Sequence, residues 1–174
     1  MHHHKGLTLA ELAIVIAIIA ILVAVAQPSF SQLISNQRSN TAAKQINQSF
    51  MFARNQALNY GARVTVCQLE GNNCSASTDW KNGYSIFIDN GVVGIVDSDN
   101  GQQDVIINVV NNFNSQDQVQ ASAASFSFES HGFLNANAAT IQLSYCPPKQ
   151  QSSQCKLISI SPAGKINTSD KPNT

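Results

Sequence analysis

The sequence predicts an α+β fold in which one long N-terminal helix packs against an antiparallel, β-rich head. Residues 7–59 carry a continuous helical pattern, which is apolar all round in its first half and forms a single apolar stripe in its second half. After Gly61 the apolar period changes to two, which is typical of strands. No helix-length pattern separates these strands, so an antiparallel sheet, or two, is favoured over a parallel βαβ arrangement.

The helical segment begins with an apolar run, Leu12–Ala26, that has a carboxylate, Glu11, at its entrance. Pro28 lacks a backbone donor, so we expect a bend there. Gly61 is suited to the position after a helix C-cap, and we expect the helix to end at Asn59. The stripe of the second half consists of apolar residues spaced by three or four: Phe30, Leu33, Ile34, Ala43, Ile46, Phe50, Ala53 and Ala57.

The head is expected to span residues 29–174, with the helix over 29–59 and a β-rich part over 62–167. Its strands are segments rich in Val, Ile and aromatic residues between turn residues: Arg63–Leu69, Gly83–Asp89, Val92–Val96, Val105–Val110, Ser125–Glu129, Thr140–Tyr145 and Lys156–Ser161. Large aromatic residues mostly pack in cores, so Trp80 and Phe87 are expected to be buried. The polar tail Thr168–Thr174 is expected to fray.

Composition limits the possible functions. The 174 residues include ten basic and ten acidic side chains, so no overall cationic field attracts nucleic acid or anionic lipid. His131 is the lone imidazole of residues 29–174, and no Ser or Cys is placed with a recognisable base. We therefore expect neither an enzyme nor a bound cofactor.

Glu11 needs an explanation because a charged side chain at bilayer depth costs about 2.5–3.5 kcal/mol. Cleavage between Gly6 and Leu7 would create an α-amino group one helical turn from that carboxylate, which could then be neutralised. Two alternatives remain open. One is an ordinary secretory signal cut before Gln27, which the position of Glu11 and the continuing helical pattern disfavour. The other is a permanent single-span anchor over Leu7–Ala26.

The four cysteines form two local pairs, Cys67 with Cys74 and Cys146 with Cys155. An even count on an exported chain favours disulfides. Three connectivities are possible, and we favour the two local ones because each closes a short polar loop. Zinc is set aside, because neither pair has the two-residue spacing of a zinc knuckle.

The N-terminal pattern of Lys5, Gly6 and Glu11 before an apolar run resembles the class III signal of type IV pilins and type II secretion pseudopilins. Two further motifs, Ala53-Arg54-x-x-Ala57 and Trp80-x-x-Gly83-Tyr84-x-x-Phe87-x-Asp89, make the chain similar to the GspH/FimT/FimU family of minor pilins and pseudopilins. The resemblance implies the type IV pilin fold, with a leader peptide over residues 1–6, a transmembrane and assembly helix over 7–28, and a periplasmic head.

The family resemblance also implies how the chain is processed and what it contacts. A prepilin peptidase would cut after Gly6 and N-methylate Leu7, and Glu11 would serve in assembly. The implied location is the inner membrane and then the pilus at the cell surface. The implied partners are the major pilin and other minor pilins, with a tip adhesin as a further candidate. A FimU-like role in priming pilus assembly is favoured, and a GspH-like pseudopilin or a FimT-like DNA-binding pilin are the alternatives.

The C-terminal region bears on the DNA-binding alternative. FimT-type proteins carry a Gly-Arg-x-Arg motif whose two guanidinium groups can clamp phosphates. Here the matching residues are Gly164-Lys165-Ile166-Asn167, which keep one cation. Lys165, Lys156 and Lys149 could form a basic edge, but solvated lysines explain them as well. DNA binding therefore ranks below assembly.

One acidic segment resembles part of a calcium loop. It contains Asp97, Asp99 and Asp104, but it lacks the third alternating ligand before Gly101 and a Glu at the distal position. Asp and Gly are also frequent in hairpin turns, which explains the segment without a metal.

Overall fold

The computed structural model describes residues 8–99, 102–111, 113–135, 139–148 and 155–171. Contacts divide the chain into two compact units, residues 1–37 and 38–174, which are described separately here. One helix, α1 (Leu9–Tyr60), contributes to both units and continues through Pro28. Gly61 follows it with a φ of 60°, a left-handed conformation that suits the residue after a C-cap. The predicted helix is confirmed, and the bend at Pro28 stays a prediction.

Twelve strands follow α1 in the described residues of the second unit. They are β1 (Val64–Cys67), β2 (Leu69–Glu70), β3 (Asn73–Cys74), β4 (Tyr84–Ile88), β5 (Ser98–Asp99), β6 (Gln102–Gln103), β7 (Val105–Val110), β8 (Gln118–Ala121), β9 (Ser125–Phe128), β10 (Ile141–Cys146), β11 (Lys156–Ile160) and β12 (Ile166–Asp170).

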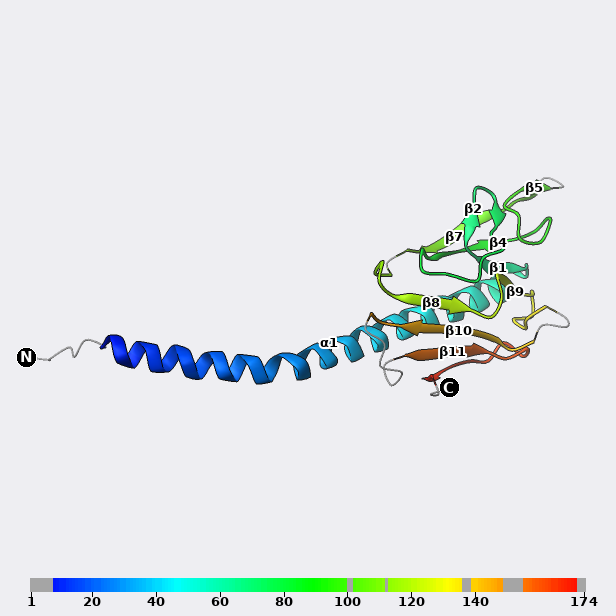
Figure 1. Cartoon of the computed structure of the whole chain (residues 1–174). Helices are drawn as coiled ribbons and strands as arrows, with labels where there is room; N and C mark the ends of the chain where they lie inside the picture. Colours follow the sequence, from blue (N-terminus) through cyan, green and yellow to red (C-terminus); the bar gives the residue numbers. More distant parts are fainter. Residues whose placement is uncertain (1–7, 100–101, 112, 136–138, 149–154, 172–174) are drawn as a thin grey trace, which may run out of the picture. The chain divides into compact units, whose positions relative to one another are not determined.

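The strands build two four-stranded sheets in the order β7-β4-β1-β9 and β12-β11-β10-β8, and two short hairpins, β2-β3 and β5-β6. Each of these strand pairings is antiparallel. Within the second unit, Figure 1 shows the helix running along both larger sheets, with β4 and β7 on one side and β10 and β11 on the other. The α+β class and the antiparallel arrangement are therefore confirmed.

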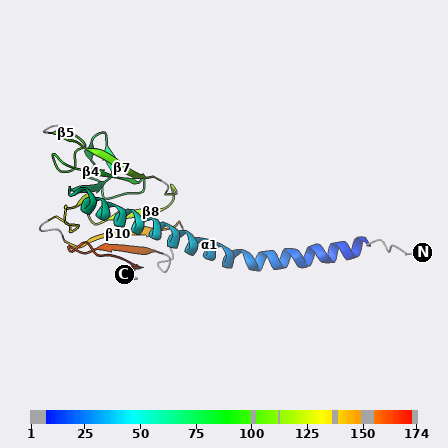
Figure 2. The ribbon, with the colours of Figure 1, turned by 180° about the vertical axis from the view of Figure 1, so that it is seen from behind.

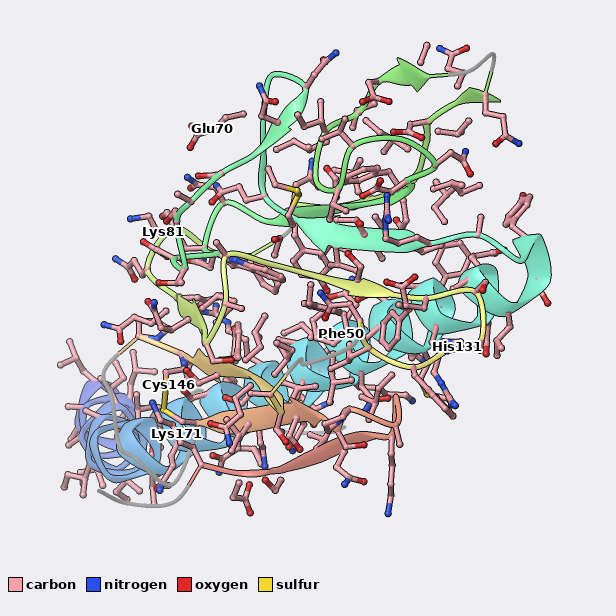
Figure 3. The ribbon with its side chains drawn as sticks, turned by 90° about the vertical axis from the view of Figure 1, so that its right-hand side faces the viewer. Phe50, Glu70, Lys81, His131, Cys146 and Lys171 are labelled. Carbon is pink, nitrogen blue, oxygen red and sulfur yellow. A yellow bond between two sulfur atoms is a disulfide. The ribbon has the colours of Figure 1, made fainter. Side chains whose placement is uncertain are left out.

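The core of the second unit lies between α1 and the two sheets. Phe50 on α1 is fully buried, and its ring meets the edge of Phe126 on β9 at a centroid distance of 5.1 Å. Trp80 also stacks on Phe126, with an interplanar angle of 8°. Figure 3 shows Phe50 pointing from the helix into this core, and Figure 2 shows the same helix from behind. The buried Trp80 and the part of the expected stripe from Ala43 to Ala57 are confirmed. Leu33 and Ile34, which were expected in the same stripe, are exposed instead.

The first sheet is covered on both faces. Val64 and Val66 of β1 belong to the core beneath α1, whereas the alternating Thr65 and Cys67 are equally buried on the opposite face. Phe87 of β4 also faces away from α1, because it is paired with Thr65. The segments around β3 and residues 91–96 lie together, since the Cys74 N–H donates to the Gly94 carbonyl at 2.8 Å.

One predicted strand was wrong, and several observed strands were not predicted. Val92–Val96 is a loop, because Gly94 adopts a φ of 78° and only Ile95 forms an isolated bridge. Strand β8, whose Gln residues alternate with buried Val119 and Ala121, was not predicted, and neither were the short strands β3, β5 and β6. Strand β12 was not predicted either, so residues 168–170 of the tail expected to fray form an edge strand instead.

Candidate assembly and binding sites

Glu11 caps the start of α1. Its Oε2 accepts hydrogen bonds from the Thr8 backbone N–H at 2.8 Å and from the Thr8 hydroxyl at 2.9 Å, and the Glu11 N–H donates to Thr8 Oγ1 at 3.3 Å. This reciprocal pattern is a capping box. This role was not predicted, although Thr8-x-x-Glu11 before an apolar run is its signature. Gly6 and Leu7 lie outside the described residues, so cleavage and methylation there stay predictions.

The helix of the first unit exposes apolar side chains. Exposed fractions run from 86% at Leu9 to 48% at Val15, and the other exposed members are Leu12, Ile14, Ile16, Ile18, Ile19, Ile21, Leu22 and Val23. These positions surround the helix instead of forming one stripe. Among the described residues, no helix meets the length and apolarity required to cross a membrane.

Both predicted disulfides are present. Cys67–Cys74 links β1 to the β2-β3 hairpin, and Cys146–Cys155 joins the end of β10 to the residue before β11. In Figure 3 the second bridge lies beside the label of Cys146. The local connectivity is confirmed.

Asp89 is the last residue of the motif that begins at Trp80, and its carboxylate is the centre of a buried polar cluster. Its Oδ1 accepts a hydrogen bond from Arg63 Nη2 at 2.8 Å, and its Oδ2 accepts from the Thr65 hydroxyl at 2.6 Å and from the Gly94 N–H at 2.9 Å. The carboxylate therefore ties β1 and β4 to the loop that follows β4. Its role is structural.

Gly83 and Tyr84 of the same motif also serve packing. Gly83 has a φ of 97°, and a Cβ there would lie 1.9 Å from the Val110 carbonyl oxygen, so only glycine fits. The Tyr84 hydroxyl lies 2.5 Å from the Ser49 hydroxyl on α1. Burial raises the pKa of Tyr84 well above its ordinary value, and the hydrogen bond with Ser49 opposes this shift only in part.

Arg54 of the alanine-arginine motif holds two loops at the end of α1. Its Nε donates to the Gly132 carbonyl at 2.8 Å. Gly164 lies so close that a Cβ there would be 2.1 Å from the Gly132 oxygen and 2.8 Å from Arg54 Nε. Ala53 and Ala57 on the same helix are fully buried. The motif therefore joins the helix to the turn before β12.

The acidic segment is explained by turn chemistry. Asp104 accepts hydrogen bonds from the backbone N–H groups of Asn90 at 2.7 Å and Asp97 at 3.2 Å. Asp99 belongs to the short hairpin β5-β6. No group of three or more potential metal ligands lies together in the described ranges, so the calcium interpretation is not supported.

The strand register does not support a basic edge shared by Lys156 and Lys165, the weaker alternative to solvated lysines. Lys156 begins β11 and is ion-paired with Asp170 of β12, whereas Lys165 lies in the turn at the other end of the same hairpin. Four residues of extended chain, about 13 Å, separate the two ends. Lys149 lies outside the described residues. Because the two lysines lie at opposite ends of one hairpin, solvated lysines remain the favoured interpretation.

The geometry described so far, a capped apolar helix continuing into an α+β head, is that of a pilin-type subunit. Residues 42–164 match the family model described as type II transport protein GspH, and residues 1–26 match the prokaryotic N-terminal methylation motif. The first match spans more than half of the chain, so the chain belongs to the GspH family. It is a structural protein of the minor pilin or pseudopilin type.

Solved structures share this fold. Two crystal structures of the type IV minor pilin FimU from Pseudomonas aeruginosa align with TM-scores of 0.57 and 0.54, at 19% and 20% identity. They cover 76% and 75% of this chain, and 89% and 91% of FimU. The minor pseudopilin EpsH from the type 2 secretion system of Vibrio cholerae aligns at 0.50 and 12% identity, covering 76% of this chain and 96% of EpsH. No curated protein sequence matches the chain significantly.

Proposed function

We propose that this chain is a non-enzymatic minor pilin that primes type IV pilus assembly and takes its place in a tip-associated complex of minor pilins. The observation that carries the proposal is the division of its apolar residues. Those of the head are buried within the chain, whereas those of Leu9–Val23 are exposed all round the helix. Such a helix needs an apolar environment, which neighbouring pilin helices or lipid would supply.

The proposal includes the processing and the location of the chain. The prepilin peptidase removes residues 1–6 and methylates Leu7. Before pilus assembly, the protein stays in the inner membrane with residues 29–174 in the periplasm. The match of residues 1–26 to the methylation motif supports this order of events. The two disulfides support a periplasmic head, because disulfides persist in oxidising compartments.

A minor pseudopilin of type II secretion is the second candidate. The observation in its favour is the fold shared with EpsH over 96% of that protein. Both candidates use the same helix and head, so they differ in partners and not in chemistry. In the native host, loss of the gene would abolish surface pili under the first proposal and protein secretion under the second.

Processing is tested by intact-mass analysis of the full chain extracted from host membranes. We expect a chain that begins at Leu7 and carries one added methyl group. A chain beginning at Gln27 would establish ordinary signal cleavage and overturn the proposal. A Gly6→Leu variant provides the control, because it should keep its leader.

A further inference from the structure

The two larger sheets end in four outer strands, and three of them are covered or polar. The outer side of β8 bonds to residues 78–80, since the Trp80 N–H donates to the Val119 carbonyl and the Ala121 N–H donates to the Thr78 carbonyl. The outer side of β9 bonds to residues 134–135 through the bridge Phe128↔Leu134. Both edges are therefore closed within the chain.

The remaining edges, β12 and β7, differ in character. The outer residues of β12 are polar and include Asp170, and α1 lies beside them because the Asn47 amide donates to the Thr168 hydroxyl at 2.9 Å. Strand β7 reads Val-Ile-Ile-Asn-Val-Val and is the terminal strand of its sheet, next to β4 (Figure 1). Natural edges are usually protected by charged residues, proline or a covering loop. Residues 105–110 contain neither charge nor proline.

A β-bulge gives β7 an unusual arrangement of side chains. The register with β4 shifts between Asn108↔Ile86 and Ile106↔Phe87, so Ile107 is an extra residue. Ile106 and Val109 are three positions apart and would normally lie on opposite faces. Because of the bulge they pair with Phe87 and Ser85, and so share the face away from α1. Their exposed fractions are 45% and 53%.

Val105 and Val110 share the other face. They pair with Ile88 and Tyr84, which both belong to the core beneath α1. By the faces of its side chains the strand is thus symmetric about its bulge, although Val105 is 49% exposed and Val110 is buried. One outer pair, Ile106 and Val109, and one inner pair, Val105 and Val110, flank the central residues Ile107 and Asn108.

We propose that β7 is a docking edge for a second copy of this chain, which adds its own β7 in antiparallel orientation across a two-fold axis at the bulge. Residues directly opposite each other in an antiparallel pair lie on the same face. In this register Ile106 lies opposite Val109 of the second copy, and Val105 lies opposite Val110. All four of these cross-strand pairs are β-branched and match in face.

The symmetric pairing explains why the edge carries no charge. A two-fold axis brings the residues beside it near their own symmetry mates, so a charge near the bulge would meet a like charge. The pairing also consumes both exposed edges at once, which makes a closed dimer and not a fibre. Because apolar contacts and backbone hydrogen bonds hold it, its strength should change little with salt.

Disulfide trapping tests the register in the full chain, purified in detergent. Chains with Ile106→Cys and chains with Val109→Cys, carrying tags of different size, are mixed under a mild oxidant. Opposite residues of a strand pair lie within the Cα range of about 4.4–6.8 Å that a disulfide needs. We expect the mixed dimer to exceed the dimers of each variant alone several-fold, because Ile106 is offset from its own symmetry mate.

The matched control uses β12, with Asn167→Cys and Ser169→Cys chains mixed in the same way. These exposed edge residues should give only background cross-linking. Far-UV circular dichroism confirms that each variant is folded. A β7 mixture that cross-links no more than its single variants, or than the β12 mixture, overturns the proposal.

A second measurement separates β7 pairing from association through the apolar helix. The mass of the full chain in detergent is determined by sedimentation, with Val109→Lys compared with Ser169→Lys. We expect the lysine on β7 to shift the population toward monomer and the lysine on β12 to leave it unchanged. A dimer that survives Val109→Lys would place the contact elsewhere and overturn the proposal.

Discussion

The two parts of α1, one in each unit, use their apolar residues differently. In the first unit, Leu9, Ile14 and Ile21 are more than half exposed, whereas in the second unit Ile46, Phe50 and Ala53 are completely buried against strands of the same chain. The difference shows that helical pattern and composition together indicate where a helix finds its partner. A stripe is satisfied by the chain's own head, whereas a helix that is apolar all round needs contacts from outside.

The difference also has an energetic side. Burying one Leu or Ile side chain stabilises by about 1.5–3 kcal/mol. The head has already gained this stabilisation in folding. The apolar side chains of the first unit are still exposed, so they can gain this stabilisation only when they pack against other helices or lipid. Substitutions in the head should therefore lower its folding stability, whereas substitutions in the first unit should weaken association.

The largest effect is expected from a core residue of the head. Phe50→Ala removes a fully buried ring and should lower the free energy of unfolding by about 3–5 kcal/mol. Met51→Ala, on the next residue of the same helix, should have little effect, because that side chain is 50% exposed. Urea unfolding of the full chain in detergent, followed by the fluorescence of the buried Trp80, measures both. Equal losses in the two variants would contradict the description of the core.

A similar or slightly smaller effect is expected at Asp89. Asp89→Ala leaves Arg63 without its buried partner and should destabilise the head by about 3 kcal/mol. Asp79→Ala also breaks an ion pair, with Lys81, but both partners are about half exposed, so the change should stay below about 1 kcal/mol. The same unfolding assay applies, and a large loss in Asp79→Ala would show that exposure does not decide the outcome.

A smaller effect is expected at alkaline pH. The pKa of Tyr84 is raised by burial, so the unfolded chain loses this proton at lower pH than the folded chain. Stability from the neutral hydroxyl is fully present below about pH 10 and is lost as pH rises toward the folded pKa. Tyr84→Phe should flatten this decline. It should also cost about 1 kcal/mol at neutral pH, because the bond with Ser49 is lost. An unchanged alkaline decline would refute the assignment.

The smallest effect is expected in the binding of duplex DNA. Lys156 is paired with Asp170 and Lys165 lies at the far end of the hairpin, so duplex DNA should bind with a Kd weaker than about 10⁻⁴ M near physiological salt. Asn167→Arg, on the exposed edge of β12, restores a second cation near Lys165 and should raise both the affinity and its salt dependence. Micromolar binding by the unmodified chain, lost in Lys165→Ala, would favour a DNA-uptake role instead.

Much of the fold could be predicted from sequence periodicity. The part of the α1 stripe from Ala43 to Ala57 and strands β1, β4, β7, β9, β10 and β11 follow from apolar spacing, and the two disulfides follow from local pairing on an exported chain. The exceptions have physical reasons. Strand β12 is polar because it is an edge, and residues 92–96 are β-branched yet form a loop because Gly94 takes a left-handed conformation.

The sites were harder to predict than the elements. The capping role of Glu11 was visible in Thr8-x-x-Glu11 but was overlooked, because its charge suggested a partner outside the helix. The separation of Lys156 from Lys165 depends on strand register, which spacing along the chain does not give. The bulge that places Ile106 and Val109 on the same face likewise depends on pairing with β4, and no residue type in β7 indicates it.

The central claim is that the apolar first unit, with the charge of Glu11, serves assembly with other pilins. The most direct test is the co-purification of pilin subunits with the full chain from host membranes, comparing Glu11→Gln with Thr8→Ala. Glu11→Gln keeps an oxygen that can accept the capping hydrogen bonds but loses the charge. Thr8→Ala loses the cap but keeps the charge. We expect co-purification to fall sharply in Glu11→Gln and to stay near the unmodified level in Thr8→Ala. Equal recovery of pilins with both variants and the unmodified chain would contradict it.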